Sequence, residues 1–213
     1  MMIRGVKTMS NQTFFSNSDV SVWMPEEIRQ SVKNTVFRYI GRNHYRGIPR
    51  QENGEVNPYQ YCYGIGRVLD AGQIFGGMVS GYPTQAFQHY APHFVEQLGN
   101  PWISEHVANI YRIVAHYPNH ADALLSQYET KARARGIKVL YSLPTKAEKD
   151  AVCNFGWFER NGFDYYAETE TEGARFYLKR IAPMPTLKPD ARWSKKREQN
   201  LSPKPIHSGA INE

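Results

Sequence analysis

Residues 107–136 read VANIYRIVAHYPNHADALLSQYETKARARG, and they carry the clearest secondary-structure signal of the chain. The apolar first part predicts a strand from His106 to Ala115. A turn at 117–119 follows, and apolar residues at helical spacing then predict a helix over 121–135 that ends at Gly136. The inner stripe of this helix is Ala123, Leu124, Tyr128 and Ala132.

Further predicted elements lie on both sides of this strand–turn–helix unit. Downstream we predict a strand over 137–142, a helix over 146–160, and strands over 163–169 and 174–180. Upstream we predict a helix over 25–41, a hairpin of strands 61–69 and 73–80, and a helix over 84–98 interrupted at Pro92. This order predicts an α/β fold, a single domain with a mixed central sheet flanked by helices.

The two ends of the chain differ in composition from this domain. Residues 1–20 are rich in Ser, Asn and Thr, which predicts a flexible arm. Residues 183–213 hold five of the 13 prolines and half of the net charge of +6, which predicts a disordered basic tail. We therefore expect one domain over 21–182 between two arms.

The composition also excludes several classes of protein. Cys62 and Cys153 are far apart and form no CxxC pair, which argues against a disulfide framework and a structural zinc site. We find neither a secretory signal nor an apolar run that could span a membrane, so we expect a cytoplasmic protein without a membrane partner. The moderate positive charge attracts anions but does not by itself identify nucleic acid as a partner.

The predicted central unit resembles the GCN5-related N-acetyltransferase (GNAT) superfamily over roughly residues 25–181. The resemblance rests on the strand ending in IYRIVA at 110–115, the following turn and helix, and the segment GIKVL at 136–140. The sequence WFERNGF at 157–163 is also similar to the superfamily's aromatic-Glu-Lys-x-Gly-Phe segment. The resemblance implies an N-acyltransferase that uses acetyl-CoA.

The turn between the predicted strand and helix is a candidate diphosphate site. A strand that leads into a helix N-terminus brings N–H groups and the positive end of the helix dipole together. The cofactor residues assigned here are His116, Asn119, His120, Ala121, Asp122 and Ala123. The family's loop, Arg/Gln-x-x-Gly-x-Gly/Ala, is about three residues longer and contains glycine, so an ordinary strand–turn–helix is the alternative interpretation.

The resemblance assigns further cofactor residues. It implies that the pantetheine arm of acetyl-CoA pairs with the backbone of Ile113, Val114 and Ala115, and that Asn154 and Phe158 also contribute to the cofactor site. Many members carry a Tyr that protonates the leaving thiolate, and Phe158 occupies that position without a proton to give. Tyr117, Tyr141 or Cys153 could replace it, although packing is the favoured interpretation of each.

A narrower resemblance connects the chain to the phage DNA-modification acyltransferases of the Mom type. It rests on YIGRNHY at 39–45, on GGMVSGYP at 76–83, and on Arg112 in the central strand before a glycine-poor turn. It implies acylation of an adenine amine in DNA with acetyl-CoA, inside the cytoplasm of a host cell. Iron has been associated with that group, so the resemblance also brings iron into consideration as a cofactor.

Four residues are candidates for catalysis: His44, Tyr45, Glu105 and Arg112. His44 is a candidate general base because an imidazole titrates near neutral pH. Glu105 is the alternative base, because its position just before the central strand resembles the place where many GNAT enzymes carry a Glu that deprotonates the amine. Arg42, Arg46 and Arg50 could hold phosphates beside tyrosines that stack a base, or they could form a solvated loop.

We assign no metal ligands. The side chains of four residues could in principle form a His and carboxylate metal site: His44, Glu105, His116 and His120. Their spacing, however, shows neither the HxH nor the HExxH pattern.

Three functions stay open on the sequence. The first is an acyltransferase that modifies an amine of a DNA base or nucleotide. The second is an acyltransferase with a small-molecule or protein amine as acceptor, and the third is a GNAT-like scaffold that binds nucleic acid or protein without catalysis.

Overall fold

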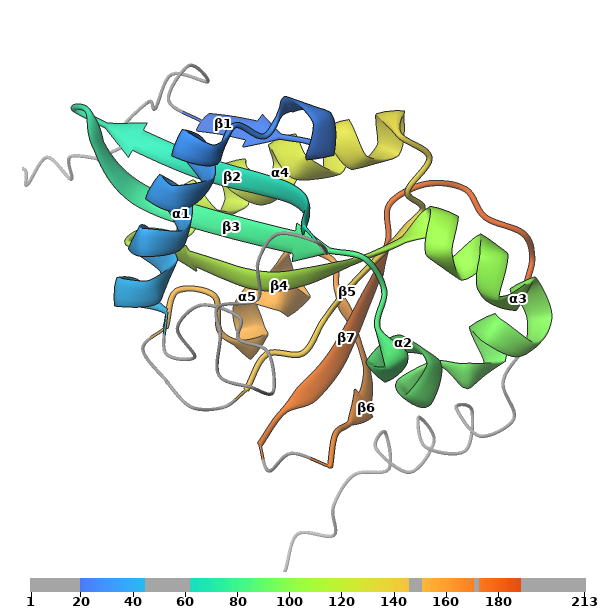
Figure 1. Ribbon diagram of the computed structural model, residues 1–213. Coiled ribbons are helices and arrows are strands. Elements are labelled where there is room, and N and C mark those ends of the chain that lie inside the picture. The colour runs from blue at the N-terminus through green and yellow to red at the C-terminus, as the bar shows by residue number, and fades with distance from the viewer. Residues whose placement is uncertain (1–19, 45–61, 146–150, 171–172, 189–213) are drawn as a thin grey trace, which may run out of the picture.

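The computed structural model describes residues 20–44, 62–145, 151–170 and 173–188 of the chain (Figure 1). The strands are β1 (Val20–Trp23), β2 (Cys62–Asp70), β3 (Gln73–Gly81), β4 (Val107–Ala115), β5 (Val139–Ser142), β6 (Asp164–Glu168) and β7 (Arg175–Arg180). The helices are the 3₁₀ turn η2 (Pro25–Glu27), α1 (Gln30–Asn43), α2 (Gln85–Tyr90), α3 (Pro92–His106), α4 (Pro118–Ala134) and α5 (Phe155–Arg160).

The seven strands form one sheet in the order β1-β2-β3-β4-β5-β7-β6. β4 and β5 are parallel, whereas every other neighbouring pair is antiparallel. The β2–β3 hairpin turns at Ala71 (φ 46°) and Gly72 (φ 79°), the two positive φ angles that a tight two-residue hairpin turn requires. The structure confirms an α/β fold with a mixed sheet in a single domain.

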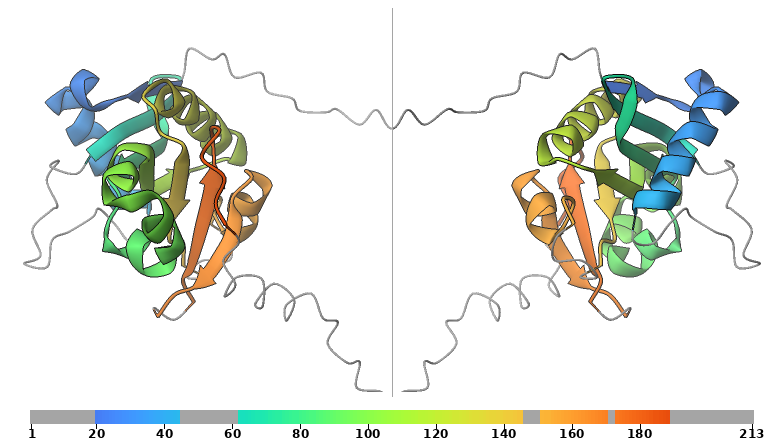
Figure 2. Two further views of the ribbon diagram at one scale, coloured as in Figure 1. Left: turned by 90° about the vertical axis from the view of Figure 1, so that its right-hand side faces the viewer. Right: turned by 90° about the vertical axis from the view of Figure 1, so that its left-hand side faces the viewer.

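Helices cover both faces of the sheet, as the side views in Figure 2 show. α1, α2 and α3 lie on one face, and α4 and α5 lie on the other. α4 packs across the sheet through Leu124, Tyr128 and Ala132, which are fully buried and follow the predicted inner stripe. The sheet is therefore the middle of three layers, and a site at its centre can open toward either helical layer.

Glycines in β2 and β3 allow the helices to approach the sheet closely. A Cβ atom on Gly66 would lie 2.9 Å from Cδ2 of Leu124 in α4, and one on Gly77 would lie 3.1 Å from Cδ1 of Tyr39 in α1. Larger residues would therefore push α4 and α1 outward. The position of α1 matters because its C-terminal end reaches the centre of the sheet, where the site described below lies.

The N-terminal part differs from the prediction in two places. Val20–Trp23 form β1, although 1–20 was expected to be an arm, because these four residues pair with β2 at the sheet edge. The helix predicted from Pro25 is divided into η2 and α1, since the Glu27 carboxylate accepts a hydrogen bond from the Met24 N–H (2.8 Å) and closes a separate turn.

Two helices also differ from their predicted lengths. α3 continues to His106 past Gly99, whose φ of 79° makes a kink inside the helix. α5 begins at Phe155 instead of residue 146, because the Asn154 side chain caps it by accepting the Trp157 N–H at 3.0 Å. Residues 146–150 lie outside the described residues.

The domain extends beyond its predicted end at residue 182. Met184 and Leu187 pack against the apolar cluster that contains Phe94 of α3. The Gln97 side chain also accepts the Lys188 N–H (2.7 Å) and donates to the Lys188 carbonyl (3.2 Å). The remainder of the predicted tail lies outside the described residues. Among those described, no helix combines the length and apolar character needed to cross a membrane.

Candidate functional site

The strands β4 and β5 diverge at the centre of the sheet. They pair only from Val107 to Asn109 of β4, opposite Val139 to Tyr141 of β5. β4 then continues for six more residues to Ala115, whereas β5 ends at Ser142. The Ser142 hydroxyl donates a hydrogen bond of 3.0 Å to the Ile110 carbonyl, one residue beyond the last pair. A parallel pair that separates in this way opens a slot in the sheet.

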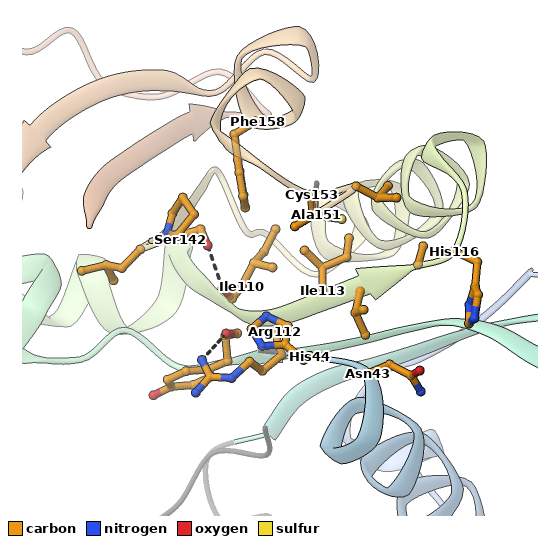
Figure 3. Close-up of a pocket in the computed structure, with 16 residues that line it drawn as sticks. Asn43, His44, Ile110, Arg112, Ile113, His116, Ser142, Ala151, Cys153 and Phe158 are labelled. Atoms are coloured by element: carbon orange, nitrogen blue, oxygen red, sulfur yellow. Dashed lines mark hydrogen bonds between the residues drawn. The ribbon is translucent and has the colours of Figure 1, made fainter. Parts of the chain in front are cut away.

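A cavity of about 260 Å³ occupies this slot (Figure 3). Its walls are β4 and the next residue (110–116), the end of β5 (142–144), the segment 151–153 with Phe158, and the end of α1 at Asn43 and His44. Figure 3 shows Ala151, Cys153 and Phe158 on one side of β4, and Asn43, His44 and Arg112 on the other. The cavity therefore has walls from both helical layers.

A bulge in β4 determines which side chains enter the cavity. Val79 faces Arg112 and Ser80 faces Ile110, so Tyr111 is an extra residue between these positions. Ile110 and Ile113 consequently belong to the same apolar cluster beneath α4, although residues three apart in a regular strand point to opposite faces. In a regular strand, Tyr111 and Arg112 would simply alternate between the two faces of the sheet, and the bulge changes this pattern. The Arg112 guanidinium donates to the Tyr111 carbonyl at 2.6 Å.

Seven of the predicted site residues line this cavity together. They are His44, Arg112, Ile113, Val114, Ala115, His116 and Phe158. His44 lies at the C-terminal cap of α1, where its N–H donates to the Ile40 carbonyl at 2.9 Å. Tyr45, the fourth catalytic candidate, lies outside the described residues.

Glu105 does not belong to this group. It lies in the last turn of α3, with a side chain that is 72% exposed and 3.9 Å from His106 Nε2. The cavity begins at Ile110, beyond the paired part of β4, and the described residues that line it include no carboxylate. The candidate proton acceptors in the lining are therefore the imidazoles of His44 and His116.

Apart from His116, the predicted diphosphate residues lie on α4 and not in the cavity lining. β4 ends at Ala115 and α4 begins at Pro118, so Asn119, Ala121 and Ala123 fall on the first two turns of the helix. The His120 side chain is buried, and burial lowers the pKa of its imidazole. Of this set, only His116 lines the cavity.

Asp122 and Asn154 have structural partners instead. The Asp122 carboxylate accepts hydrogen bonds from Trp157 Nε1 (2.8 Å) and Asn161 Nδ2 (3.1 Å), and so ties α4 to α5. Asn154 caps α5. Both side chains fix the position of α5, and α5 in turn places Phe158 in the wall of the cavity.

Among the three candidate proton donors, only Cys153 lines the cavity. Burial raises the pKa of its thiol. The Tyr141 hydroxyl is buried in another cluster against Thr84 (3.1 Å), and burial raises the pKa of Tyr141 to about 12. Tyr117 is 52% exposed and lies outside the lining.

Sequence reasoning missed several lining residues, above all Asn43, Ser142 and Ala151. Ser142 ends a predicted strand next to the central one, and that position was the only available signal. The metal candidates His44, Glu105, His116 and His120 do not come together. In the described part of the chain, no group of three or more His, Cys, Asp or Glu residues is arranged to hold a metal ion.

Comparison with known proteins gives no match to a protein-family model or to a curated protein. Solved structures, however, share the fold. The ribosomal-protein-S18-alanine N-acetyltransferase from Escherichia coli is 12% identical, with a TM-score of 0.50 over 78% of this chain and 96% of that chain. A protein described as a GNAT-family acetyltransferase, from Desulfovibrio desulfuricans, is 17% identical, with a TM-score of 0.50 over 76% and 99% of the two chains.

TofI in its apo form is 16% identical, with a TM-score of 0.52 over 76% of this chain and 90% of that chain. These similarities extend over most of each protein, at identities that establish the fold alone. The chain has the fold of the GNAT acetyltransferases.

Proposed function

We propose that the chain is an N-acyltransferase that takes its acyl group from a pantetheine thioester such as acetyl-CoA. The observation that carries this proposal is the slot between β4 and β5, because it lies beside a strand edge and has walls from both faces of the sheet. A donor can enter from one face and an acceptor from the other, so that the two meet at the bulge.

The edge of β4 supports binding of the donor arm. From Ile113 to Ala115, β4 pairs with β3 on one side and borders the cavity on the other. An extended chain with amide groups, such as pantetheine, can pair with such a strand edge as an added strand does. Ile113, Val152 and Phe158 supply apolar walls for its methylene groups.

The side of the cavity next to α1 supports binding of the acceptor amine. The amine nitrogen attacks the thioester carbon, the new C–N bond forms, and the C–S bond breaks to release the thiol. Oriented N–H groups near the bulge would stabilise the negative charge that develops on the carbonyl oxygen. The His44 imidazole accepts the proton that the amine loses, and the same proton then passes to the sulfur as the thiolate leaves, so His44 returns to its neutral form.

The surface of α1 favours an acceptor that carries phosphates, an amine of a DNA base or nucleotide. Residues 30–43 contain Lys33, Arg38 and Arg42 and no acidic residue. Arg38 and Arg42 are exposed one helical turn apart, and the helix ends at the cavity wall. Guanidinium groups at this place can hold phosphates while the amine enters the cavity. The resemblance to the Mom-type enzymes favours the same class of acceptor.

Mass spectrometry tests this function. Purified protein is incubated with acetyl-CoA and single- or double-stranded DNA, and the digested nucleosides are analysed for an added acyl mass. The proposal predicts a modified nucleoside that depends on acetyl-CoA and is lost in His44→Gln. Unmodified DNA with modified small-molecule or peptide amines would reject the nucleic acid acceptor and retain the acyltransferase.

Charge reversal tests the role of α1 separately. Arg38→Glu with Arg42→Glu should weaken DNA binding at least tenfold and reduce its dependence on salt, because phosphate contacts are lost. Arg160→Glu with Arg180→Glu, which reverses two exposed arginines at the ends of α5 and β7, is the charge-matched control and should have little effect. Equal losses in both variants would show that only the overall charge matters.

A further inference from the structure

We infer that this site recognises its donor through the acyl-pantetheine arm, and that the adenosine diphosphate end of CoA contributes little to binding. The inference rests on the proposed function and specifies its donor. It follows from the turn between β4 and α4, where the open end of the slot meets a helix N-terminus. Four features of this turn make it a poor diphosphate site.

The first feature is the small number of N–H donors. A helix N-terminus binds phosphate through the N–H groups of its first turn, which have no partner within the helix. Here the first residue of α4 is Pro118, which has no N–H. The His120 N–H already donates to the Tyr117 carbonyl at 3.1 Å, which leaves Asn119 as the donor among the first three residues of α4.

The second feature is the length of the connection. Only His116 and Tyr117 lie between the last residue of β4 and the first residue of α4, and neither is glycine. The His116 N–H donates to the Phe75 carbonyl at 3.0 Å, so this residue continues the pairing of β4 with β3. A loop that wraps around a diphosphate needs several residues whose N–H groups point inward, and two residues cannot form it.

The third feature is charge. No Lys or Arg occurs from His116 to Thr130, which covers the turn and the first three turns of α4. Asp122 lies in the second turn, and the Asp70 carboxylate is near enough to His120 to influence its pKa. The buried His120 imidazole favours its neutral form, since burial is the main cause that lowers its pKa. Within 116–130, a diphosphate would therefore meet a carboxylate and no cationic Lys or Arg side chain.

The fourth feature is the space itself, which aromatic rings fill. Phe75 of β3 stacks with Tyr117 at 6.5 Å between ring centroids and contacts His116 at 5.3 Å and His120 at 6.0 Å. The Tyr39 hydroxyl bonds to His116 Nδ1 at 2.8 Å, which ties α1 to the same cluster. These rings fill the space in which the backbone N–H groups of a diphosphate-binding loop would otherwise lie.

The arm, in contrast, has a built site in the slot. The β4 edge supplies backbone groups over Ile113–Ala115, and Ile113, Val152 and Phe158 supply apolar walls. The free energy of donor binding should therefore come from the acyl group and the pantetheine amides. A donor shortened to this arm should keep most of the affinity.

Isothermal titration calorimetry with acetyl-CoA and with S-acetylpantetheine tests the inference on the full chain. We expect dissociation constants within about tenfold of each other, a difference below about 1.4 kcal/mol. An acetyl-CoA affinity at least 100-fold higher would overturn the inference and leave the acyltransferase proposal intact. Binding of neither compound would instead reject the proposed function.

Two variants test whether the slot or the turn before α4 provides the free energy of donor binding. Ala151→Trp, which fills the slot, should weaken both compounds more than tenfold. Tyr117→Ala, at an exposed side chain of the turn, should leave both affinities within twofold of the wild type. If Tyr117→Ala weakened acetyl-CoA alone, the turn would hold the adenosine end and the inference would be wrong.

Discussion

The Ser142 hydroxyl donates a 3.0 Å hydrogen bond to the carbonyl of Ile110, and this bond lies at the point where β4 and β5 separate. Both groups are buried. A carbonyl in β4 beyond Asn109 receives no backbone N–H from β5, because the pairing of the two strands has ended. The side chain of Ser142 satisfies the first of these carbonyls, and so allows the sheet to open without a buried group left unsatisfied.

Ser142→Ala should therefore destabilise the protein. The substitution removes the donor and leaves a buried carbonyl without it, which costs about 1–3 kcal/mol. Urea denaturation measures the change. Ser126→Ala, on the exposed side of α4, is the control and should change the free energy of unfolding by less than about 0.5 kcal/mol. Equal stability of the two variants would show that the bond does not support the opening.

Gly64→Ala should destabilise the protein by overpacking. A Cβ atom on Gly64 would lie 2.9 Å from Cε2 of Tyr128 and 3.0 Å from Oγ of Ser80, and both of these side chains are fully buried. We expect a loss of about 1–3 kcal/mol in thermal or urea denaturation. Gly156→Ala in α5 meets only ordinary contacts of 3.5 Å or more and should be neutral or stabilising. A neutral Gly64→Ala would contradict the close packing of α4 on β2.

Lys179→Met should cost about 3 kcal/mol, because it leaves the Glu129 carboxylate without its cation. The two side chains form an ion pair between β7 and α4 and are only 19% and 11% exposed. Combining the change with Glu129→Leu should recover most of the lost stability. Glu26→Gln breaks a more exposed pair with Arg135 and should cost less than about 1 kcal/mol in the same assay. A similar small loss in Lys179→Met would contradict a buried pair.

The protein should lose stability as the pH rises from about 9 to 11. Burial raises the pKa of Cys62 from 9.0 to about 11. In this range the unfolded chain releases a proton that the folded protein retains, so deprotonation favours unfolding. The pKa values of Tyr141 and Tyr177, each raised from 10.0 to about 12, extend the loss above pH 10. The free energy of unfolding, measured by urea denaturation at each pH, should fall less steeply between pH 9 and 10 in Cys62→Ala than in the wild type. Identical slopes in the two proteins would refute the assignment to Cys62.

The sequence predicts the elements whose signals are local. The β4–α4 unit follows from the apolar run and the helical stripe of Leu124, Tyr128 and Ala132. The β2–β3 hairpin follows from two apolar runs that flank the turn at 70–72, in which Gly72 readily takes a positive φ angle. β1 was missed because four residues show no reliable period and become a strand only through pairing with β2.

The site was predictable only in part, because its opening is a property of pairing in three dimensions. Arg112, Ile113 and His116 were found from their place on the central strand. Ser142 and Ala151 were missed because nothing in the sequence tells where β4 and β5 separate. Glu105 was assigned to the site from its position in the chain, yet it lies before the paired part of β4.

Hydrogen exchange of β4 tests the central claim most directly, because the claim places the donor arm along this strand edge. Exchange is measured by mass spectrometry on peptides covering 107–116, with and without S-acetylpantetheine at saturating concentration. We predict slower exchange within 110–115 in the wild type, and no change in Ala151→Trp. If the exchange rate of 110–115 stayed unchanged while another segment of the protein became protected, a donor site between β4 and β5 would be contradicted.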